Sequence, residues 1–197
     1  KADGKGNVWF AANSLFRYDT TNSGIHTYSI GGSQPMMLTV DSLGTIWVLL
    51  QDGNLYTYDR LNDTFRHQHL QHKTKIIEAV SGGKLLAATY DNEVLLLDCI
   101  SLNGKQIFDN RDKKEIRCLK ESSENEFWIG TDSGLYIRRN GVDYQGEAFH
   151  DASTPGSLSE NFITSIDKDR SGNLWIGTYY TGINIWKGSN EDMAIYF

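Results

Sequence analysis

The chain has 197 residues, 39% hydrophobic and 22% charged, a balance that excludes a disordered chain and is typical of a soluble globular protein. Nineteen basic residues against 25 acidic ones give a net charge of −6, which argues against nucleic-acid binding because phosphate recognition needs clustered positive charge. No apolar run reaches the ~18 residues of a membrane span. No basic segment followed by an apolar one opens the sequence, so any export leader is expected to lie outside it.

One motif recurs along the chain: an aspartate, two residues, a glycine, one residue, an apolar residue and a tryptophan. Two further copies are degenerate, one with Ser122 and Asn125 in the aspartate and glycine positions, the other with leucine in the tryptophan position. The five copies end at Trp9, Trp47, Leu86, Trp128 and Trp175. A period of roughly 40 residues with aromatic runs between glycine turns indicates the four-stranded blade of a β-propeller.

Each repeat is predicted to contain four antiparallel strands. The first strand precedes the turn, the second carries the tryptophan, the third is a second apolar run, and the fourth is a weaker alternating segment. The predicted first strands are Met36–Asp41, Lys75–Val80, Glu115–Lys120 and Phe162–Asp169, and the first repeat lacks one. The predicted fourth strands are Ile25–Ile30, Thr64–Leu70, Gln106–Asp109, Asp143–His150 and Met193–Phe197. The repeats then cover approximately residues 1–34, 35–74, 75–114, 115–161 and 162–197, all in one all-β propeller segment.

The recurring residues are predicted to have structural roles. A tight hairpin needs a residue with positive φ, which glycine supplies and asparagine tolerates. The aspartate accepts backbone N–H groups and sets the turn, and the tryptophan fills the gap between neighbouring sheets. These structural residues are Asp3, Gly6 and Trp9; Asp41, Gly44 and Trp47; Gly83; Asn125 and Trp128; and Asp169, Gly172 and Trp175.

The last two repeats resemble the two-component regulator propeller family. The string begins Ser157-Leu158 with Asn161 and Ile163 following, continues as Asp169-Arg-Ser-Gly-Asn-Leu-Trp-Ile-Gly-Thr178, and ends Gly182-Ile-Asn-Ile-Trp186. Trp128-Ile-Gly-Thr131 repeats its core. The resemblance implies a seven-bladed propeller in the periplasmic sensor of a Bacteroidetes hybrid two-component system. Such sensors commonly respond to oligosaccharides and signal, as dimers, through a membrane segment to a histidine kinase. With five repeats, the chain is interpreted as a piece of that ectodomain, a closed five-bladed ring being the alternative.

Ligand sites in propellers lie on one face of the ring, built from the loops between second and third strands and from the links between repeats. Tyrosines suit this purpose because they offer a flat apolar face and a hydroxyl, although they could simply cover the tryptophan layer. The candidate ligand-binding residues are Tyr90, Tyr179 and Tyr180, with Gln51, Asp52, Asp91 and Asn92 as hydrogen-bonding groups. In one link, Arg111, Lys113 and Lys114 could meet an acidic sugar or form a solvated loop.

Other chemistry is weighed and set aside. His67 and His69 share one face of a strand and could ligate zinc, but no third fixed ligand accompanies them, so a solvated face is favoured. Cys99 and Cys118 are predicted to be free, buried thiols. An aspartate that recurs once per repeat serves the turn rather than catalysis, and the turn's spacing differs from that of the sialidase aspartate box. No catalytic residue, metal or cofactor is predicted.

The hypothesis from sequence is therefore a non-catalytic periplasmic sensor segment, from the ectodomain of an inner-membrane protein, that binds or relays an oligosaccharide signal. Its expected partners are an oligosaccharide and the remainder of the sensor, with a homodimer in the parent protein and no nucleic acid. The first alternative is a protein–protein interaction propeller, although its usual repeat signatures do not recur here. The second is a glycan-active propeller enzyme, which would need an acid pair outside the repeat pattern.

Overall fold

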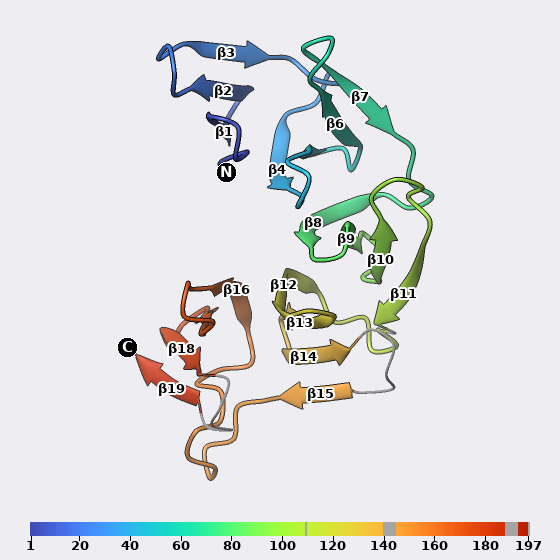
Figure 1. Ribbon diagram of the computed structural model, residues 1–197. Coiled ribbons are helices and arrows are strands. Elements are labelled where there is room, and N and C mark those ends of the chain that lie inside the picture. The colour runs from blue at the N-terminus through green and yellow to red at the C-terminus, as the bar shows by residue number, and fades with distance from the viewer. Residues whose placement is uncertain (109, 140–144, 188–192, 197) are drawn as a thin grey trace. The chain divides into compact units, whose positions relative to one another are not determined.

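The computed structural model describes residues 1–108, 110–139, 145–187 and 193–196, and every regular element among them is a β-strand (Figure 1). The prediction of an all-β protein is therefore confirmed. The nineteen strands pair in sequence order into five antiparallel sheets, one of three strands and four of four strands. The described residues contain no helix that could cross a membrane. The chain divides into two compact units, residues 1–90 with 94–106 and residues 91–93 with 107–197.

The first unit holds two whole sheets and most of a third. The first sheet contains β1 (Asn7–Ala11), β2 (Leu15–Asp19) and β3 (Ile25–Tyr28). The second contains β4 (Pro35–Val40), β5 (Ile46–Leu50), β6 (Leu55–Asp59) and β7 (Thr64–Gln68). The third contains β8 (Thr74–Val80), β9 (Lys84–Thr89), β10 (Val94–Asp98) and β11 (Gly104–Phe108).

The second unit holds the other two sheets. The fourth sheet contains β12 (Ile116–Ser123), β13 (Glu126–Thr131), β14 (Gly134–Arg139) and β15 (Gln145–Ala148). The fifth contains β16 (Ile163–Lys168), β17 (Leu174–Thr178), β18 (Ile183–Trp186) and β19 (Met193–Tyr196). Residues 109 and 140–144 and residue 197, which fall in or beside predicted fourth strands, lie outside the described residues.

The predicted ends are wrong by one to three residues in both first and fourth strands, and the largest error is at β12, which ends at Ser123 rather than Lys120. β3 ends at Tyr28 rather than Ile30, β7 at Gln68 rather than Leu70, and β15 at Ala148 rather than His150; β11 starts at Gly104 rather than Gln106. A fourth strand pairs with a neighbour on one side only, and β7, for example, is largely exposed. Because few of its side chains are buried, its sequence shows only a weak alternation of apolar and polar residues, and its ends are hard to predict.

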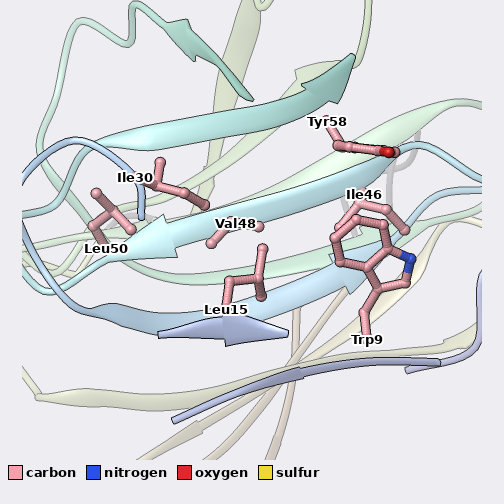
Figure 2. Close-up of a cluster of buried hydrophobic side chains, with 7 residues drawn as sticks. All are labelled: Trp9, Leu15, Ile30, Ile46, Val48, Leu50 and Tyr58. Atoms are coloured by element: carbon pink, nitrogen blue, oxygen red, sulfur yellow. The ribbon is translucent and has the colours of Figure 1, made fainter. Parts of the chain in front are cut away.

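In the second, third and fourth sheets, the second strand is buried on both faces, which explains its largely apolar sequence. In β5, all five residues are buried. Ile46, Val48 and Leu50 pack with Trp9 and Leu15 of the first sheet (Figure 2). On the other face, Trp47 and Leu49 pack with Ile77, Leu85 and Ala87 of the third sheet.

The fourth and fifth sheets pack in the same manner. Trp128 of β13 is 1% exposed and contacts Ile166, Leu174 and Ile176 of the fifth sheet, while its ring lies 4.9 Å from that of Trp186. Trp175 is 42% exposed, and its predicted role of filling a gap between sheets stays a prediction. Leu174 and Ile176 face the fourth sheet, so the alternate face of β17 carries Trp175 and is not covered within the described part of this unit.

The hairpin turns join the tryptophans to the recurring carboxylates. The φ angles are positive at Gly6, Gly44, Gly83 and Gly172 (64–88°), and Asn125 adopts the same left-handed conformation at 63°. Asp41 Oδ1 accepts hydrogen bonds from the N–H groups of Leu43 and Thr45, and its Oδ2 accepts one from the indole of Trp47 at 3.0 Å. Asp3 and Asp169 accept the same set from their turns and from Trp9 and Trp175. Each carboxylate is thus occupied in ordering its own hairpin.

Candidate functional site

One edge of each four-stranded sheet brings the loop after the second strand against the link that enters the first strand. A backbone hydrogen bond joins the two segments at the same place every time. These bonds run from Gln51 N to Gln34 O (2.9 Å), Tyr90 N to Lys73 O (3.0 Å), Asp132 N to Glu115 O (3.1 Å) and Tyr179 N to Phe162 O (3.1 Å). The side chains of both segments are therefore presented side by side from a fixed backbone.

A β-bulge lies beside this edge in all four of these sheets. The register shifts by one residue near the start of the first strand, between Pro35 and Met37, Thr74 and Ile76, Ile116 and Cys118, and Ile163 and Ser165. A bulge leaves one residue unpaired and re-aims its side chain, and bulges are common beside functional sites. In β12 the residue skipped by the register is Arg117.

The second unit displays an aromatic cluster at this edge, formed by Phe162, Tyr179 and Tyr180. The rings of Phe162 and Tyr179 lie 5.1 Å apart, and those of Tyr179 and Tyr180 lie 4.5 Å apart and nearly perpendicular. Tyr179 is 59% exposed and Tyr180 is 82% exposed. The two exposed tyrosines and the half-buried Phe162 therefore form a platform of contacting rings that faces solvent.

Charged groups border the aromatic cluster. The Arg117 guanidinium lies over the ring of Phe162, 4.6 Å from its centroid, and pairs with Glu115 at 3.2 Å. The carboxylate of Glu160 accepts a hydrogen bond from Tyr180 N at 2.8 Å and so fixes the loop backbone. Together these residues combine flat apolar faces with hydroxyl, carboxylate and guanidinium groups, which is the chemistry that a polyhydroxylated ring requires.

The predicted residues of the first unit form a separate group. The hydroxyl of Tyr90, a residue 51% exposed, donates to the carbonyl of Gln51 at 3.2 Å. The Asp52 carboxylate accepts from the backbone N–H and the side-chain amide of Asn54, at 3.0 and 2.8 Å, so it serves its own turn.

Asn92, predicted as a ligand-binding residue, has a structural role within the second unit. Its φ is 61°, its side-chain oxygen accepts from Ile116 N at 3.3 Å, and its carbonyl accepts from Asn110 Nδ2 at 3.0 Å. Asp91 is exposed beside it. Neither residue belongs to the aromatic cluster, which the two predicted tyrosines share with Phe162.

The histidines and cysteines show no sign of a reactive site. The rings of His67 and His69 lie 4.3 Å apart, but the described residues contain no group of three metal-ligating side chains. Cys99 and Cys118 are free. Burial raises the pKa of the Cys99 thiol to about 11 and that of the Cys118 thiol to about 12, so both stay protonated and unreactive at neutral pH.

Sequence reasoning missed Phe162 and Arg117 as parts of the cluster. Phe162 was predicted to be the first residue of a first strand, whereas β16 starts one residue later and leaves Phe162 in the link. A usable signal existed: Phe162 occupies the position just before the strand that Glu115 occupies one repeat earlier. The position of Arg117 depends on the bulge, which no motif in the sequence marks.

Comparison with known proteins agrees with this geometry. Residues 157–180 match the two component regulator propeller family, so the predicted repeat is confirmed for this stretch, which includes the whole aromatic cluster. A search of the curated proteins finds no significant match.

Solved structures with the same fold include the extracellular domain of BT4673 from B. thetaiotaomicron, named as that of a hybrid two component system. It is 21% identical with a TM-score of 0.73, over 92% of this chain and 26% of that one. Virginiamycin B lyase from Staphylococcus aureus is 18% identical with a TM-score of 0.75, and the match covers 100% of this chain and 68% of the lyase chain. PorZ of the type-IX secretion system of Porphyromonas gingivalis is 12% identical with a TM-score of 0.67, and the match covers 97% of this chain and 32% of the PorZ chain.

These likenesses establish a β-propeller fold, and the class of protein that the structure defines is a propeller segment. The chain spans about a quarter of the length of the BT4673 extracellular domain.

Proposed function

We propose that the chain is a non-catalytic segment of an extracytoplasmic sensor and that its aromatic cluster contacts an oligosaccharide. The observation that carries the proposal is the exposed platform of Phe162, Tyr179 and Tyr180. Solvent-exposed rings of this kind bury a sugar's C–H face, while neighbouring polar groups bind its hydroxyls.

Two further observations support a sensor rather than another kind of propeller. The platform lies inside the stretch that matches the two component regulator propeller family. BT4673, whose extracellular domain shares the fold, is named as a hybrid two component system. We place the segment in the periplasm, in a parent protein that signals as a dimer through a membrane segment.

The platform is unlike a catalytic site. Hydrolysis of a glycosidic bond uses a pair of carboxylates set about 5–9 Å apart across the bond, one of them with a raised pKa. Near the platform, Glu115 is paired with Arg117, and Glu160 accepts a hydrogen bond from a backbone N–H that fixes its own loop. The carboxylates of Asp3, Asp41 and Asp169 are bound into their turns.

Calorimetric titration of the purified chain with a panel of neutral and acidic oligosaccharides tests the proposal. We expect at least one to bind and the Tyr180→Ala variant to weaken it by about tenfold or more, the loss typical of an exposed aromatic anchor. Phe10→Ala is the matched control, because Phe10 is also an exposed aromatic residue in contact with another ring, that of Phe16, and it belongs to no predicted ligand site. Equal losses in the two variants, an absence of any binder, or turnover of a glycan would each contradict the proposal.

A further inference from the structure

The second unit contains a pocket of about 350 Å³ whose lining residues differ from those of the aromatic cluster and include Arg111 and Lys114 of the link that the sequence indicated for an acidic sugar. We call it the cationic pocket. It lies between the end of β11, the link that follows it, and strands β14 and β15. The residues that line it include Phe108, Arg111, Lys114, Tyr136, Arg138 and Glu147.

The central feature of the pocket is a buried guanidinium. Arg138 is 8% exposed, and its guanidinium lies 4.9 Å from the centroid of Phe108 and 5.8 Å from that of Tyr136, two rings that are themselves 5.2 Å apart. Its Nη1 donates to the carbonyl of Ile137 at 2.8 Å. The aromatic rings and this hydrogen bond fix the orientation of the guanidinium.

Arg138 has no ion-pair partner among the described residues. The other cations nearby differ: Lys114 pairs with Asp112 at 2.6 Å and lies 5.1 Å from the centre of the Tyr136 ring. Burial lowers the pKa of Arg138, although the nearby charge of Glu147 opposes the shift, and an arginine keeps its charge at neutral pH. A buried charge without an ion-pair partner is costly, so an anion bound beside Arg138 would offset part of this cost.

The charged groups of the described lining favour an anion of single negative charge. Asp112 and Glu147 line the pocket together with Arg138 and Lys114. A dianion such as phosphate would meet more repulsion from these two carboxylates than a monoanion would. The planar guanidinium can donate two parallel hydrogen bonds to a carboxylate.

The size and apolar walls of the pocket indicate that the carboxylate belongs to a ring-shaped molecule. A volume of 350 Å³ is at the lower end of the range for small-molecule sites, which start at about 300 Å³. Phe108 and Tyr136 supply an apolar floor beside the charge. We infer that the cationic pocket binds a carboxylate-bearing sugar through Arg138. Because this sugar would be part of the proposed oligosaccharide signal, the inference rests on the proposed function.

The test uses galacturonate, a sugar with a single carboxylate, and its methyl ester, which keeps the skeleton but removes the charge. We expect calorimetry on the full chain to show binding of the acid and at least tenfold weaker binding of the ester. Arg138→Met, which retains much of the packing against Phe108, should weaken binding of the acid to the level of the ester. Since Arg138 is buried, Lys114→Gln provides a second variant that should also weaken the acid if Arg138→Met fails to fold.

The outcomes separate this inference from the proposed function. Equal binding of acid and ester, or inorganic phosphate binding as tightly as the acid, overturns the carboxylate-sugar site. If neutral oligosaccharides bind and Tyr180→Ala abolishes that binding while the acid shows no preference, the proposed function stands and the cationic pocket fails. If galacturonate binds with loss only in Arg138→Met and no loss in Tyr180→Ala, the cationic pocket stands and the role of the aromatic cluster fails.

Discussion

Trp128 and Trp175 occupy the same position in adjacent repeats, yet one is 1% exposed and the other 42% exposed. Both indole N–H groups donate to a carboxylate at 3.1 Å, from Glu126 and Asp169 respectively. A carboxylate therefore holds the indole in both repeats, although it comes from a different sequence position in each, while burial depends on whether another sheet covers that face. The repeat motif specifies the hairpin, and the neighbouring sheet determines how much energy the tryptophan contributes.

Truncating each tryptophan should give the largest difference between the two repeats. Trp128→Ala removes a side chain packed on Ile166, Leu174 and Ile176, and should lower the free energy of unfolding by about 3–5 kcal/mol. Trp175→Ala removes a partly exposed ring and should cost less than about 2 kcal/mol. Urea unfolding followed by circular dichroism measures both values. Equal losses would mean that the alternate face of β17 is covered in solution.

The sequence predicted the hairpins well because their determinants are local. A positive φ at Gly44 and an aspartate three residues earlier are enough to order the turn, and both are visible in the motif. The fourth copy looked degenerate, but Glu126, two residues before the tryptophan, replaces the missing aspartate and accepts from Ser122 and Trp128. The motif alone could not show this, because the substitute carboxylate comes from a different sequence position.

The candidate site was only partly predictable for the opposite reason. Tyr179 and Tyr180 stand out in a loop, so sequence reasoning found them. The positions of Phe162, Arg117 and Arg138 depend on bulges and on contacts between strands that are far apart in the sequence. No pattern within one repeat encodes these distances. A tyrosine in a loop can be recognised by its context, but an arginine that stacks on a ring from another strand cannot.

Gly130 and Gly177, which follow Trp128 and Trp175 by two residues, extend the comparison between the fourth and fifth sheets. A Cβ added at Gly130 would lie 2.4 Å from Cys118 Sγ and 2.7 Å from Ile163 Cγ2, inside the packed interior. A Cβ added at Gly177 would meet the Ser165 hydroxyl at 2.6 Å, and Ser165 is exposed and can rotate away. Gly130→Ala should therefore destabilise the protein by about 2–3 kcal/mol through overpacking. Gly177→Ala should cost well under half of that in the same urea experiment, and a larger loss than for Gly130→Ala would contradict the packing argument.

The smallest expected effect comes from the carboxylates that hold the two indoles. Burial pushes the pKa of Glu126 up, but hydrogen bonds from Ser122 and Trp128 and the ion pair with Arg139 outweigh it, so the pKa lies below its ordinary value. Hydrogen bonds from Asn173 and Trp175 lower the pKa of Asp169 to about 2. A carboxylate whose pKa is depressed in the folded protein stabilises the fold at pH values above its pKa in the unfolded chain, about 4.3 for glutamate. This stabilisation disappears as the pH falls through the pKa of the folded state.

Glu126→Gln should therefore lower the free energy of unfolding by about 1–2 kcal/mol at pH 7, because it weakens hydrogen bonds to a largely buried group. The difference in free energy of unfolding between the parent protein and this variant should shrink as the pH falls below about 4.3. Asp169→Asn is the matched control: its turn is exposed to solvent, so its effect at pH 7 should be smaller, and its difference should disappear at lower pH. Urea unfolding at several pH values between neutral and acid measures both differences. If this difference in free energy of unfolding grew toward acid pH for Glu126→Gln, the Glu126 carboxyl would be protonated in the folded protein. The fourth hairpin would then be held by a neutral hydrogen bond rather than by the charged carboxylate that an aspartate supplies in the other repeats.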